Sequence, residues 1–418
     1  MTVVDSSNGS ASLPSPGSLQ ARLVEAIQLH QTGQLSEAER AYRQLLAEFP
    51  GDTNVAHFLG LLCFQQGAPE QGLTLVQQSL DSDPDNPHAW NNLGNMYSHL
   101  NRRDDAREAY LRATGIGVPS APAWYNLSRI YLRERKMEEA LGALREATRA
   151  GSGFVDALQT LAFVYYRLGR PEDARDVYKQ WAAEAPNDPT PRHMLAAASG
   201  QDVPARADDR YIVKTFNRFA ESFDEKLRGL EYCAPQLVAA SLIHHPLYQT
   251  GRAAVLDAGC GTGLCGPLLK STASRLVGVD LSPKMLEQAS DRGVYDDVHV
   301  GELTGFMRSH PAEFDIVVAA DVLCYFGELE TAVQAARQTL RPGGILSFSV
   351  EALLDASSDE NFRIRLHGRY SHARSYVVRV LECAGFAPPH IDPAVLRKEF
   401  GQPVHGYIVM TQLPVAHT

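Results

Sequence analysis

Two different hydrophobic periods divide this chain of 418 residues. From Leu19 to Asp188, small residues recur every 34 positions, and large apolar or aromatic residues follow them four positions later. The small positions are Ala38, Gly72, Ala106, Ala140 and Ala174, and the large ones are Tyr42, Val76, Tyr110, Leu144 and Tyr178. This spacing predicts stacked helix pairs, in which small residues allow close approach and large residues fill the space between neighbouring pairs.

Beyond residue 210, short apolar runs alternate with helical segments, a pattern typical of a parallel sheet. The apolar spacing in 211–224 predicts an amphipathic helix, and another helix is expected over 234–245. Strands are expected over 255–257, 275–280, 298–302, 314–321 and 340–350, with helices over 264–270 and 283–290 and a terminal antiparallel pair near 390–396 and 404–413. Residues 189–199 predict a helix that caps the repeats.

The segment Val255–Gly263 carries the strongest chemical signal. Three glycines, Gly259, Gly261 and Gly263, follow a short apolar strand and precede a helix, so a ligand can approach the main chain and the first turn of the helix. Asp280 ends the next apolar run, where a carboxylate can accept bonds from ribose hydroxyls. Gly261–Gly266 also matches a dinucleotide fingerprint, but that match starts two residues too late in the turn.

The motif Leu256-Asp-Ala-Gly-Cys-Gly-Thr-Gly263 resembles the first motif of class I S-adenosylmethionine-dependent methyltransferases, and the 34-residue period resembles the tetratricopeptide repeat. Together they resemble a bacterial tetratricopeptide-repeat methyltransferase. The resemblance implies an α-solenoid of five helix pairs followed by an α/β Rossmann-like, seven-stranded domain. The expected divisions are a flexible N-terminus (1–18), repeats with a capping helix (19–200), a linker (201–209) and the methyltransferase domain (210–418), with lid helices in 210–245.

This resemblance also implies a site for S-adenosylmethionine. Asp257 suits the cationic amino acid moiety, Asp280 the ribose, Met285 the adenine ring and Glu302 the adenine amino group. Aromatic residues at 219, 223, 325 and 326 are expected to surround the sulfonium. The residues assigned to the cofactor are Asp257, Gly259, Gly261, Gly263, Asp280, Leu281, Met285, Glu302, Leu303, Asp321 and Tyr325.

The acceptor is less constrained. The segment Ala320–Leu323 lacks the Asn/Asp-Pro-Pro pattern of enzymes that methylate planar nitrogen, which leaves oxygen, an aliphatic amine or carbon. The residues assigned to catalysis are His372, Tyr370 and Asp321, with Glu351 and His367 as further candidate bases. The alternative interpretation is that Gly368–His372 binds substrate or closes the pocket. Arg397–Glu399 either meets an anionic substrate or is a solvated loop.

Composition and charge argue against several classes of protein. A net charge of −10 argues against a dedicated nucleic-acid binder. The six cysteines form no Cys-x-x-Cys pair, so neither a metal site nor a disulfide framework is expected. With no apolar run of membrane-spanning length and no signal-peptide pattern, we expect no membrane association and a cytoplasmic protein.

We therefore expect a methyltransferase whose repeats recruit a protein or carrier-bound acceptor. Candidate residues for a peptide in the repeat groove are Asn91, Asn92, Asn126 and Arg129. The alternative is an adaptor protein whose cofactor-binding domain is structural or regulatory.

Overall fold

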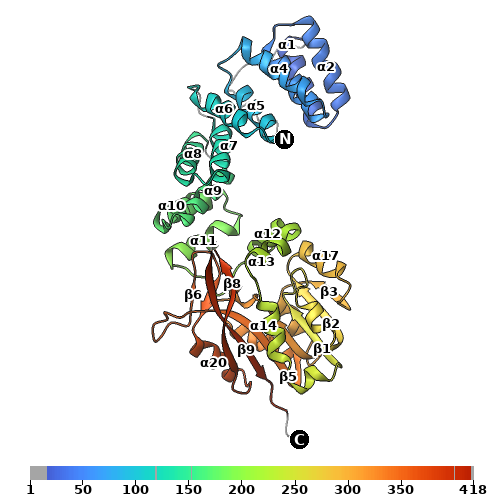
Figure 1. The fold of residues 1–418 in the computed structure, drawn as a ribbon, viewed down its shortest axis with the longest axis vertical. Helices are drawn as coiled ribbons and strands as arrows, with labels where there is room; N and C mark the ends of the chain where they lie inside the picture. The colour runs from blue at the N-terminus through green and yellow to red at the C-terminus, as the bar shows by residue number, and fades with distance from the viewer. Residues whose placement is uncertain (1–16, 118–119, 152, 400, 416–418) are drawn as a thin grey trace. The chain divides into compact units, whose positions relative to one another are not determined.

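The computed structural model describes residues 17–117, 120–151, 153–399 and 401–415 (Figure 1). It divides into two compact units, Met1–Arg170 and Pro171–Thr418. The predicted flexible N-terminus lies almost wholly outside the described residues. No helix in the described ranges is both long and apolar enough to cross a membrane.

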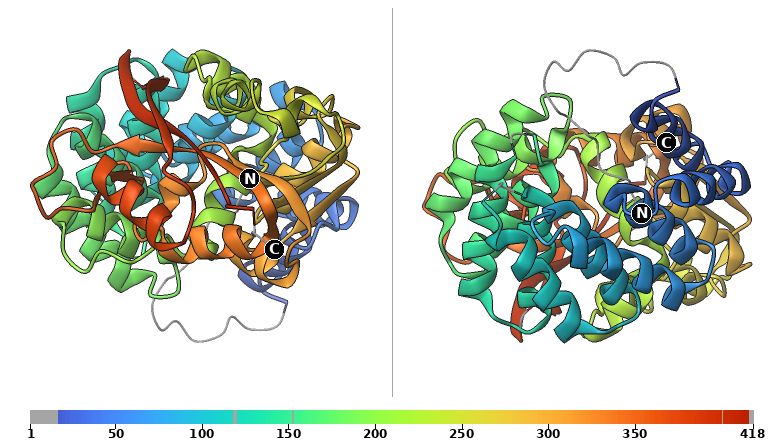
Figure 2. Two further views of the ribbon diagram at one scale, coloured as in Figure 1. Left: turned by 90° about the horizontal axis from the view of Figure 1, so that it is seen from below. Right: turned by 90° about the horizontal axis from the view of Figure 1, so that it is seen from above.

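The first unit is built from paired helices, seen in blue to teal in Figure 2. They are α1 (Leu19–Gln31), α2 (Leu35–Glu48), α3 (Thr53–Gln65), α4 (Pro69–Ser82), α5 (Pro87–His99), α6 (Arg103–Gly115), α7 (Ala121–Arg133), α8 (Met137–Ala150) and α9 (Val155–Arg167). Side chains of Ser18, Asp52 and Asn86 cap the first helix of three successive pairs.

The small residues of the 34-residue period lie where two helices of a pair meet. An added Cβ at Gly72 would lie 2.6 Å from the carbonyl oxygen of Gly60, so the pair α3 and α4 approaches too closely for a side chain. Ala38, Ala106 and Ala140 are fully buried at the equivalent positions. The prediction of stacked, tetratricopeptide-like helix pairs is confirmed.

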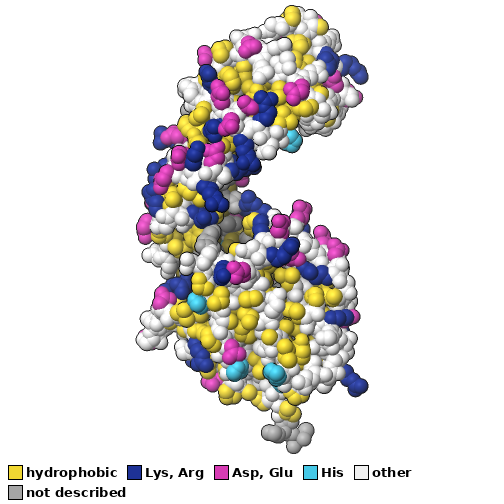
Figure 3. Space-filling view, viewed as in Figure 1, with side chains coloured by type: hydrophobic (Ala, Val, Ile, Leu, Met, Phe, Trp, Pro, Cys, Tyr) yellow, Lys and Arg dark blue, Asp and Glu magenta, His cyan; other side chains and the backbone are white. Residues whose placement is uncertain are grey.

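Charged side chains of both signs are interspersed over the helices of the first unit on the face shown in Figure 3. Many form short-range pairs, such as Arg107 with Asp104 and Glu134. Because the opposite charges of such pairs cancel locally, this face carries no extended patch of purely positive or purely negative charge.

The second unit begins with two more helices, α10 (Pro171–Glu184) and α11 (Pro189–Ser199), which pack against each other. Next come α12 (Asp209–Phe219), η1 (Ala220–Ser222), α13 (Phe223–Gly229), α14 (Ala234–Leu242) and α15 (Pro246–Gln249). Further helices are α16 (Gly266–Leu269), α17 (Pro283–Asp291), α18 (Leu303–Ser309), η2 (Leu323–Tyr325), α19 (Glu330–Thr339) and α20 (Arg374–Cys383).

The strands of the second unit form one sheet. They are β1 (Ala253–Ala258), β2 (Ala273–Asp280), β3 (Asp297–Val300), β4 (Phe314–Ala319), β5 (Leu340–Ala352), β6 (Phe362–Ile364), β7 (Tyr370–His372), β8 (His390–Glu399) and β9 (Gln402–Gln412). The order is β3-β2-β1-β4-β5-β7-β6, parallel from β3 to β7, while β9 pairs antiparallel with β5 and β8. Seven of these strands were predicted. The short β6 and β7 add two more in the described residues.

Both faces of the central strands are buried, which accounts for their continuous apolar runs. One face, with Leu256, Val317 and Phe348, joins a core that includes α19 and α20. The other face, with Val255 and Ile316, joins a core that includes α14. This arrangement fixes the carboxyl ends of β1, β2 and β4 next to one another.

The predicted linker, residues 201–209, is an ordered part of the second unit. The Ala205 carbonyl accepts bonds from the N–H groups of Gly327 and Glu328, and the Ala207 N–H donates to the Tyr325 carbonyl. Residues 201–209 therefore run alongside the loop after β4 and lead directly into α12.

Candidate functional site

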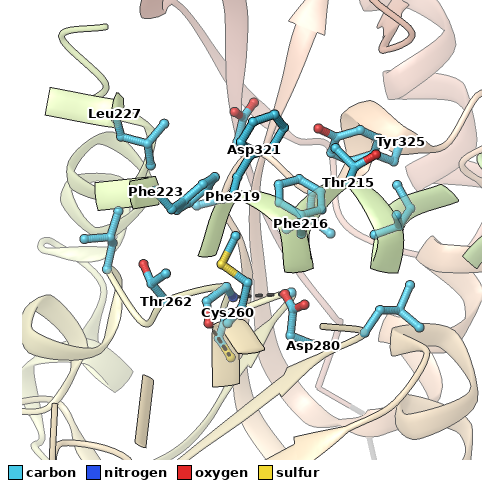
Figure 4. A pocket seen from close by; sticks show the side chains of 18 of the residues that line it. Thr215, Phe216, Phe219, Phe223, Leu227, Cys260, Thr262, Asp280, Asp321 and Tyr325 are labelled. Atoms are coloured by element: carbon cyan, nitrogen blue, oxygen red, sulfur yellow. Dashed lines mark hydrogen bonds between the residues drawn. The ribbon is translucent and has the colours of Figure 1, made fainter. Parts of the chain in front are cut away.

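A cavity of about 410 Å³ lies at the carboxyl ends of β1, β2 and β4 (Figure 4). Its volume falls within the range of small-molecule sites, and its position is where open α/β sheets bind ligands. The predicted site residues that line it are Gly259, Gly261, Asp280, Leu281, Met285, Glu302, Leu303, Asp321 and Tyr325.

The glycine turn after β1 forms the floor of this cavity. The N–H groups of Gly259 and Cys260 donate to the Val279 carbonyl at 2.7 and 3.0 Å. Gly259 has φ +79°, and an added Cβ would lie 2.5 Å from Val322. Gly261 has φ +56° with open space where a Cβ would be, so its backbone conformation, and not crowding, favours glycine there.

Asp280 connects the turn to the end of β2. One carboxylate oxygen accepts the Gly261 N–H at 3.0 Å and the other accepts the Ser282 N–H at 2.8 Å. Burial raises the pKa of Asp280 above its ordinary value. Each oxygen retains acceptor capacity toward the cavity, as a ribose-binding carboxylate requires.

Apolar residues and one carboxylate form the wall beyond Asp280. Leu281, Met285 and Leu303 line it. Glu302 also caps α18, because its carboxylate accepts the N–H groups of Thr304 and Gly305. These bonds hold the pKa of Glu302 below its usual value despite the opposing effect of burial.

The predicted lid helix covers the cavity as α12 and α13. Phe216 meets the rings of Phe223 and Tyr325 edge-on, with centroids 5.9 and 5.6 Å apart. Phe219 lines the same space, and the Lys226 ammonium lies 4.1 Å from its ring centroid. An aromatic enclosure of this kind suits a cationic ligand group.

Asp224 fastens the lid to the glycine turn. The Thr262 hydroxyl donates to one of its oxygens at 2.6 Å, and the Arg292 guanidinium pairs with the other. Arg292 also donates to the Thr262 carbonyl. Sequence reasoning did not assign this contact, since its three residues belong to separate segments without a common motif.

Two arginines and three carboxylates form a cluster at the opposite end of the cavity. Arg397, almost fully buried, contacts both oxygens of Asp321 at 2.8 and 2.9 Å, and it also pairs with Glu351 and Glu399. Arg369 pairs with the same two glutamates. Asp321, Arg369, Arg397 and Glu399 line the cavity, whereas Glu351 lies behind them.

The pKa values in this cluster follow from its pairing. Burial opposes ionisation of Glu351, but Arg369 and Arg397 hold its pKa at about 2. The same arginines hold the pKa of Glu399 below its usual value. Asp321 has φ +59°, a strained conformation for a residue other than glycine, and its N–H is bonded to the Ser349 hydroxyl.

His372 and Tyr370, predicted to act in catalysis, do not line the cavity, so this structure does not bring them together with Asp321 at the site. Both are fully buried. His372 Nε2–H donates to the carbonyls of Phe326 and Gly327, and the Tyr370 hydroxyl donates to the Pro204 carbonyl. Burial lowers the pKa of His372 to about 4, so the ring is neutral and holds the loop after β4 in place. The further candidate His367 also lies off the cavity, beside Glu351.

Asp257 and Gly263, predicted to bind the cofactor, likewise do not line the cavity. The Tyr295 hydroxyl donates to Asp257 Oδ2 at 2.6 Å, and the carboxyl group is almost fully buried. A Cβ at Gly263 would lie 2.8 Å from the Tyr295 ring, and the residue has φ +83°, so both packing and backbone conformation favour glycine there.

The predicted peptide-binding asparagines of the first unit are largely used within it. Asn126 Nδ2 donates to Asn91 at 3.1 Å and to Asn95 at 3.0 Å, and Asn91 is buried. The Asn92 amide donates to His57, and Arg129 lies over the Tyr125 ring. The prediction that Asn91 clamps a peptide is therefore wrong.

Further lining residues were not singled out from the sequence. They are Arg206 and Ala207 of the predicted linker, and Tyr232 and Pro235, which lie just before and within α14 in the predicted lid region. Their composition carries no local signal of a ligand. In the described residues, no group of three or more His, Cys, Asp or Glu side chains is arranged to hold a metal ion.

Comparison with known protein families assigns both units. A methyltransferase domain matches residues 256–348, and tetratricopeptide repeats match residues 23–87, 63–131 and 131–198. The chain contains tetratricopeptide repeats and a methyltransferase domain. The last repeat match extends past Arg170 and includes α10 and α11, which belong to the same compact unit as the methyltransferase domain.

The relatives of the methyltransferase domain carry methyltransferase names, among them several O-methyltransferases. Another is an 18S rRNA (guanine-N(7))-methyltransferase of Bos taurus, 42% identical over 65 residues that cover 16% of this chain and 23% of that protein. The chain is 30% identical over 141 residues to a ubiquinone biosynthesis O-methyltransferase of Aromatoleum aromaticum, covering 32% of this chain and 60% of that protein. It is 31% identical over 157 residues to a malonyl-[acyl-carrier protein] O-methyltransferase of Yersinia pestis, covering 38% and 55%. This chain thus spans little more than half the length of these two O-methyltransferases.

Among solved structures, a Burkholderia thailandensis 1,6-didemethyltoxoflavin-N1-methyltransferase with bound S-adenosylhomocysteine is similar with a TM-score of 0.39 and 21% identity. That match covers 51% of this chain and 93% of that one. A crystal structure of MamA is similar with a TM-score of 0.34 and 21% identity, covering 38% and 94%.

Proposed function

We propose that this chain is an S-adenosylmethionine-dependent methyltransferase that methylates an oxygen of an acceptor recruited by its repeats. The observation that carries the proposal is one cavity with two unlike ends. The glycine turn and Asp280 lie at one end, the cluster of Asp321, Arg397 and Glu399 lies at the other, and aromatic lid residues cover the space between them.

The residues at the first end fit the cofactor. Asp280 would accept bonds from the ribose hydroxyls, Leu281 and Met285 would contact the adenine, and the lid phenylalanines would surround the sulfonium. The bound cofactor supplies an electrophilic methyl group. The protein contributes mainly position and exclusion of water, because in-line displacement depends on alignment of the reacting atoms.

The acid–base character of the second end favours oxygen over an aliphatic amine. An aliphatic ammonium group has a pKa near 10 and must lose a proton before it can attack. Histidine is absent from the described residues that line the cavity, and the lining carboxylates Asp321 and Glu399 are ion-paired with Arg397. The two arginines hold the pKa of Glu399 below its usual value, which makes this carboxylate a weak base, and Arg397 contacts both oxygens of Asp321. A carboxylate or an acidic hydroxyl needs little or no help from a base.

The presence of repeats in the same chain supports recruitment of the acceptor. Repeat arrays bind extended peptides or partner helices, which would bring a protein-bound or carrier-bound acceptor near the cavity. The malonyl-[acyl-carrier protein] relative acts, by its name, on a carrier-bound acceptor.

The first test is calorimetric titration of the full chain with S-adenosylmethionine, followed by a search for methylated products. Mass spectrometry of a deletion strain should show loss of a species one methylene heavier than its precursor. If the cofactor binds and no such species exists, the chain is an adaptor with a regulatory cofactor site. If the cofactor does not bind, both interpretations are excluded.

A second test separates recruitment from chemistry. Removal of residues 1–170 leaves the second compact unit intact, including α10 and α11. The shortened protein should bind the cofactor as the full chain does, and KM for the native acceptor should rise while kcat changes little. Equal KM values for both proteins would exclude recruitment by the first unit.

A further inference from the structure

The lid helix α12 has two occupied faces. Ile212, Thr215, Phe216 and Phe219 line the cavity, three of them labelled in Figure 4. Tyr211 and Lys214, three residues apart, lie on a different face and contact α11. The capping helix of the repeat region therefore supports the helix that covers the cofactor cavity.

The contact at Lys214 is an ion pair. Its ammonium donates to Asp188 Oδ2 at 2.6 Å, while Asp188 Oδ1 accepts the Thr190 N–H at 3.0 Å and caps α11. The Asp188 side chain is only 11% exposed, compared with 53% for Lys214. The Lys214 ammonium also lies 6.0 Å from the ring centroid of Trp181 on α10. One lysine thus connects the lid to both α10 and α11.

A second contact lies one turn away, at Tyr211. Its ring stacks on the His193 imidazole with centroids 4.4 Å apart, and its hydroxyl lies 3.9 Å from the Met194 sulfur. His193 Nε2–H donates to the Gly368 carbonyl at 2.7 Å, next to Arg369 of the acceptor end. Helix α11 therefore contacts both the lid helix α12 and the turn that carries Arg369.

We propose that Asp188 and Lys214 are positioning residues that hold the lid helix over the cofactor cavity. This proposal rests on the proposed function, because it takes S-adenosylmethionine as the ligand under the lid. A helix of 11 residues is marginal alone in water and depends on packing. Phe216 on its cavity face contacts Phe223 and Tyr325. Asn217 accepts the Ser282 hydroxyl of the neighbouring segment. The contacts with α10 and α11 on its other face add to these and so help to determine how much of the protein has a closed lid.

The consequence for binding follows from population arithmetic. If only part of the protein has a closed lid, the apparent affinity for the ligand falls in proportion to that part. Loss of the Asp188–Lys214 pair should therefore weaken cofactor binding without changing any residue that lines the cavity.

The test uses the full chain with Lys214→Met, Asp188→Asn and the double variant. Asparagine at 188 retains the N-cap, and methionine at 214 retains the apolar stem. Each single variant should weaken the Kd for S-adenosylmethionine by roughly 3- to 10-fold, and the double variant should be no weaker than either. Lys214→Arg should restore most of the affinity. Lys179→Met, which removes an ion pair within α10, is the matched control and should leave Kd unchanged.

Hydrogen exchange of the ligand-free protein gives an independent readout. Amides of residues 209–219 should exchange faster in Lys214→Met and Asp188→Asn, whereas those of β1 should not change. Folded variants with wild-type Kd and wild-type exchange in α12 would overturn the proposal, as would additive losses in the double variant. If the wild-type chain binds no cofactor, the proposed function fails, while exchange in α12 still decides whether the pair supports the lid.

Discussion

The two ends of the cavity are built in opposite ways. Beneath the lid, the cofactor end comes from one stretch of chain, β1 to the start of α18, and presents backbone groups and the carboxylate of Asp280. The acceptor end comes from distant segments, since Arg397 and Asp321 are 76 positions apart, and its charged groups bind one another. The first end keeps hydrogen-bonding capacity for a ligand, whereas the second uses most of its own to stay folded.

This difference predicts whether a substitution mainly changes ligand affinity or folding stability. Removal of a group from the cofactor end should reduce ligand affinity and leave the fold nearly intact. Removal of a central group from the acceptor end should leave buried charges without partners, which costs folding stability before it affects a ligand.

The largest effect is expected for Arg397→Met. Arg397 is buried and pairs with three carboxylates, so its loss should lower the free energy of unfolding by about 3–5 kcal/mol, measured by urea denaturation. Arg341→Met is the matched control, because its pair with Asp315 is partly exposed and should contribute less than about 1 kcal/mol. Equal, small losses in the two variants would mean that the acceptor end is not held together by its charges.

The opposite behaviour is expected for Asp280→Ala. Loss of charge-assisted bonds to the ribose should weaken S-adenosylmethionine binding by roughly 1.5–3 kcal/mol, which is about 10- to 150-fold in Kd. Calorimetry measures this, with Asp291→Ala, exposed on α17, as the control. Wild-type affinity in a folded Asp280→Ala protein would remove Asp280 from the ribose site.

What the sequence could predict follows the same division. The repeats, β1, the glycine turn, β2 and the lid helix are encoded by local spacing, and each was found at the expected place. The burial of Asp257 was not predictable, because Tyr295, which covers it, lies 38 positions later in the chain. The orientation of His372 was also hidden: all three residues of β7 are buried, so no alternation indicates which side chain faces a ligand.

His372→Ala tests this buried position. The variant should be about 1–3 kcal/mol less stable at pH 8, since two backbone carbonyls lose their donor. The pKa of His372 is about 4 in the folded chain and 6.5 in a model peptide. The contribution of the neutral ring is therefore complete above pH 6.5 and is lost as the pH falls toward 4.

Urea denaturation at pH 8 and pH 5 should thus show a smaller difference between wild type and His372→Ala at pH 5. Cofactor affinity should change little at pH 8. A folded variant with wild-type stability and lost turnover would instead support a catalytic role for His372.

The smallest effect, and the sharpest test of the cofactor end, is expected for Asp257→Asn. Burial raises the pKa of Asp257 to about 7 in the folded chain, against 3.8 in a model peptide. The folded state therefore holds this proton more tightly, and the stability that it contributes is present at low pH and lost as the pH rises through 7. Asparagine is neutral at every pH and can still accept the Tyr295 hydroxyl. We expect the variant to be more stable than wild type by about 1 kcal/mol at pH 8, with the difference shrinking as the pH falls below 7 and vanishing below pH 3.8. Because Asp257 does not line the cavity, the affinity of the Asp257→Asn protein for S-adenosylmethionine should match that of wild type in calorimetry at pH 8. A collapse of affinity in the folded variant would show that the carboxylate reaches the ligand after all, as the motif alone suggested.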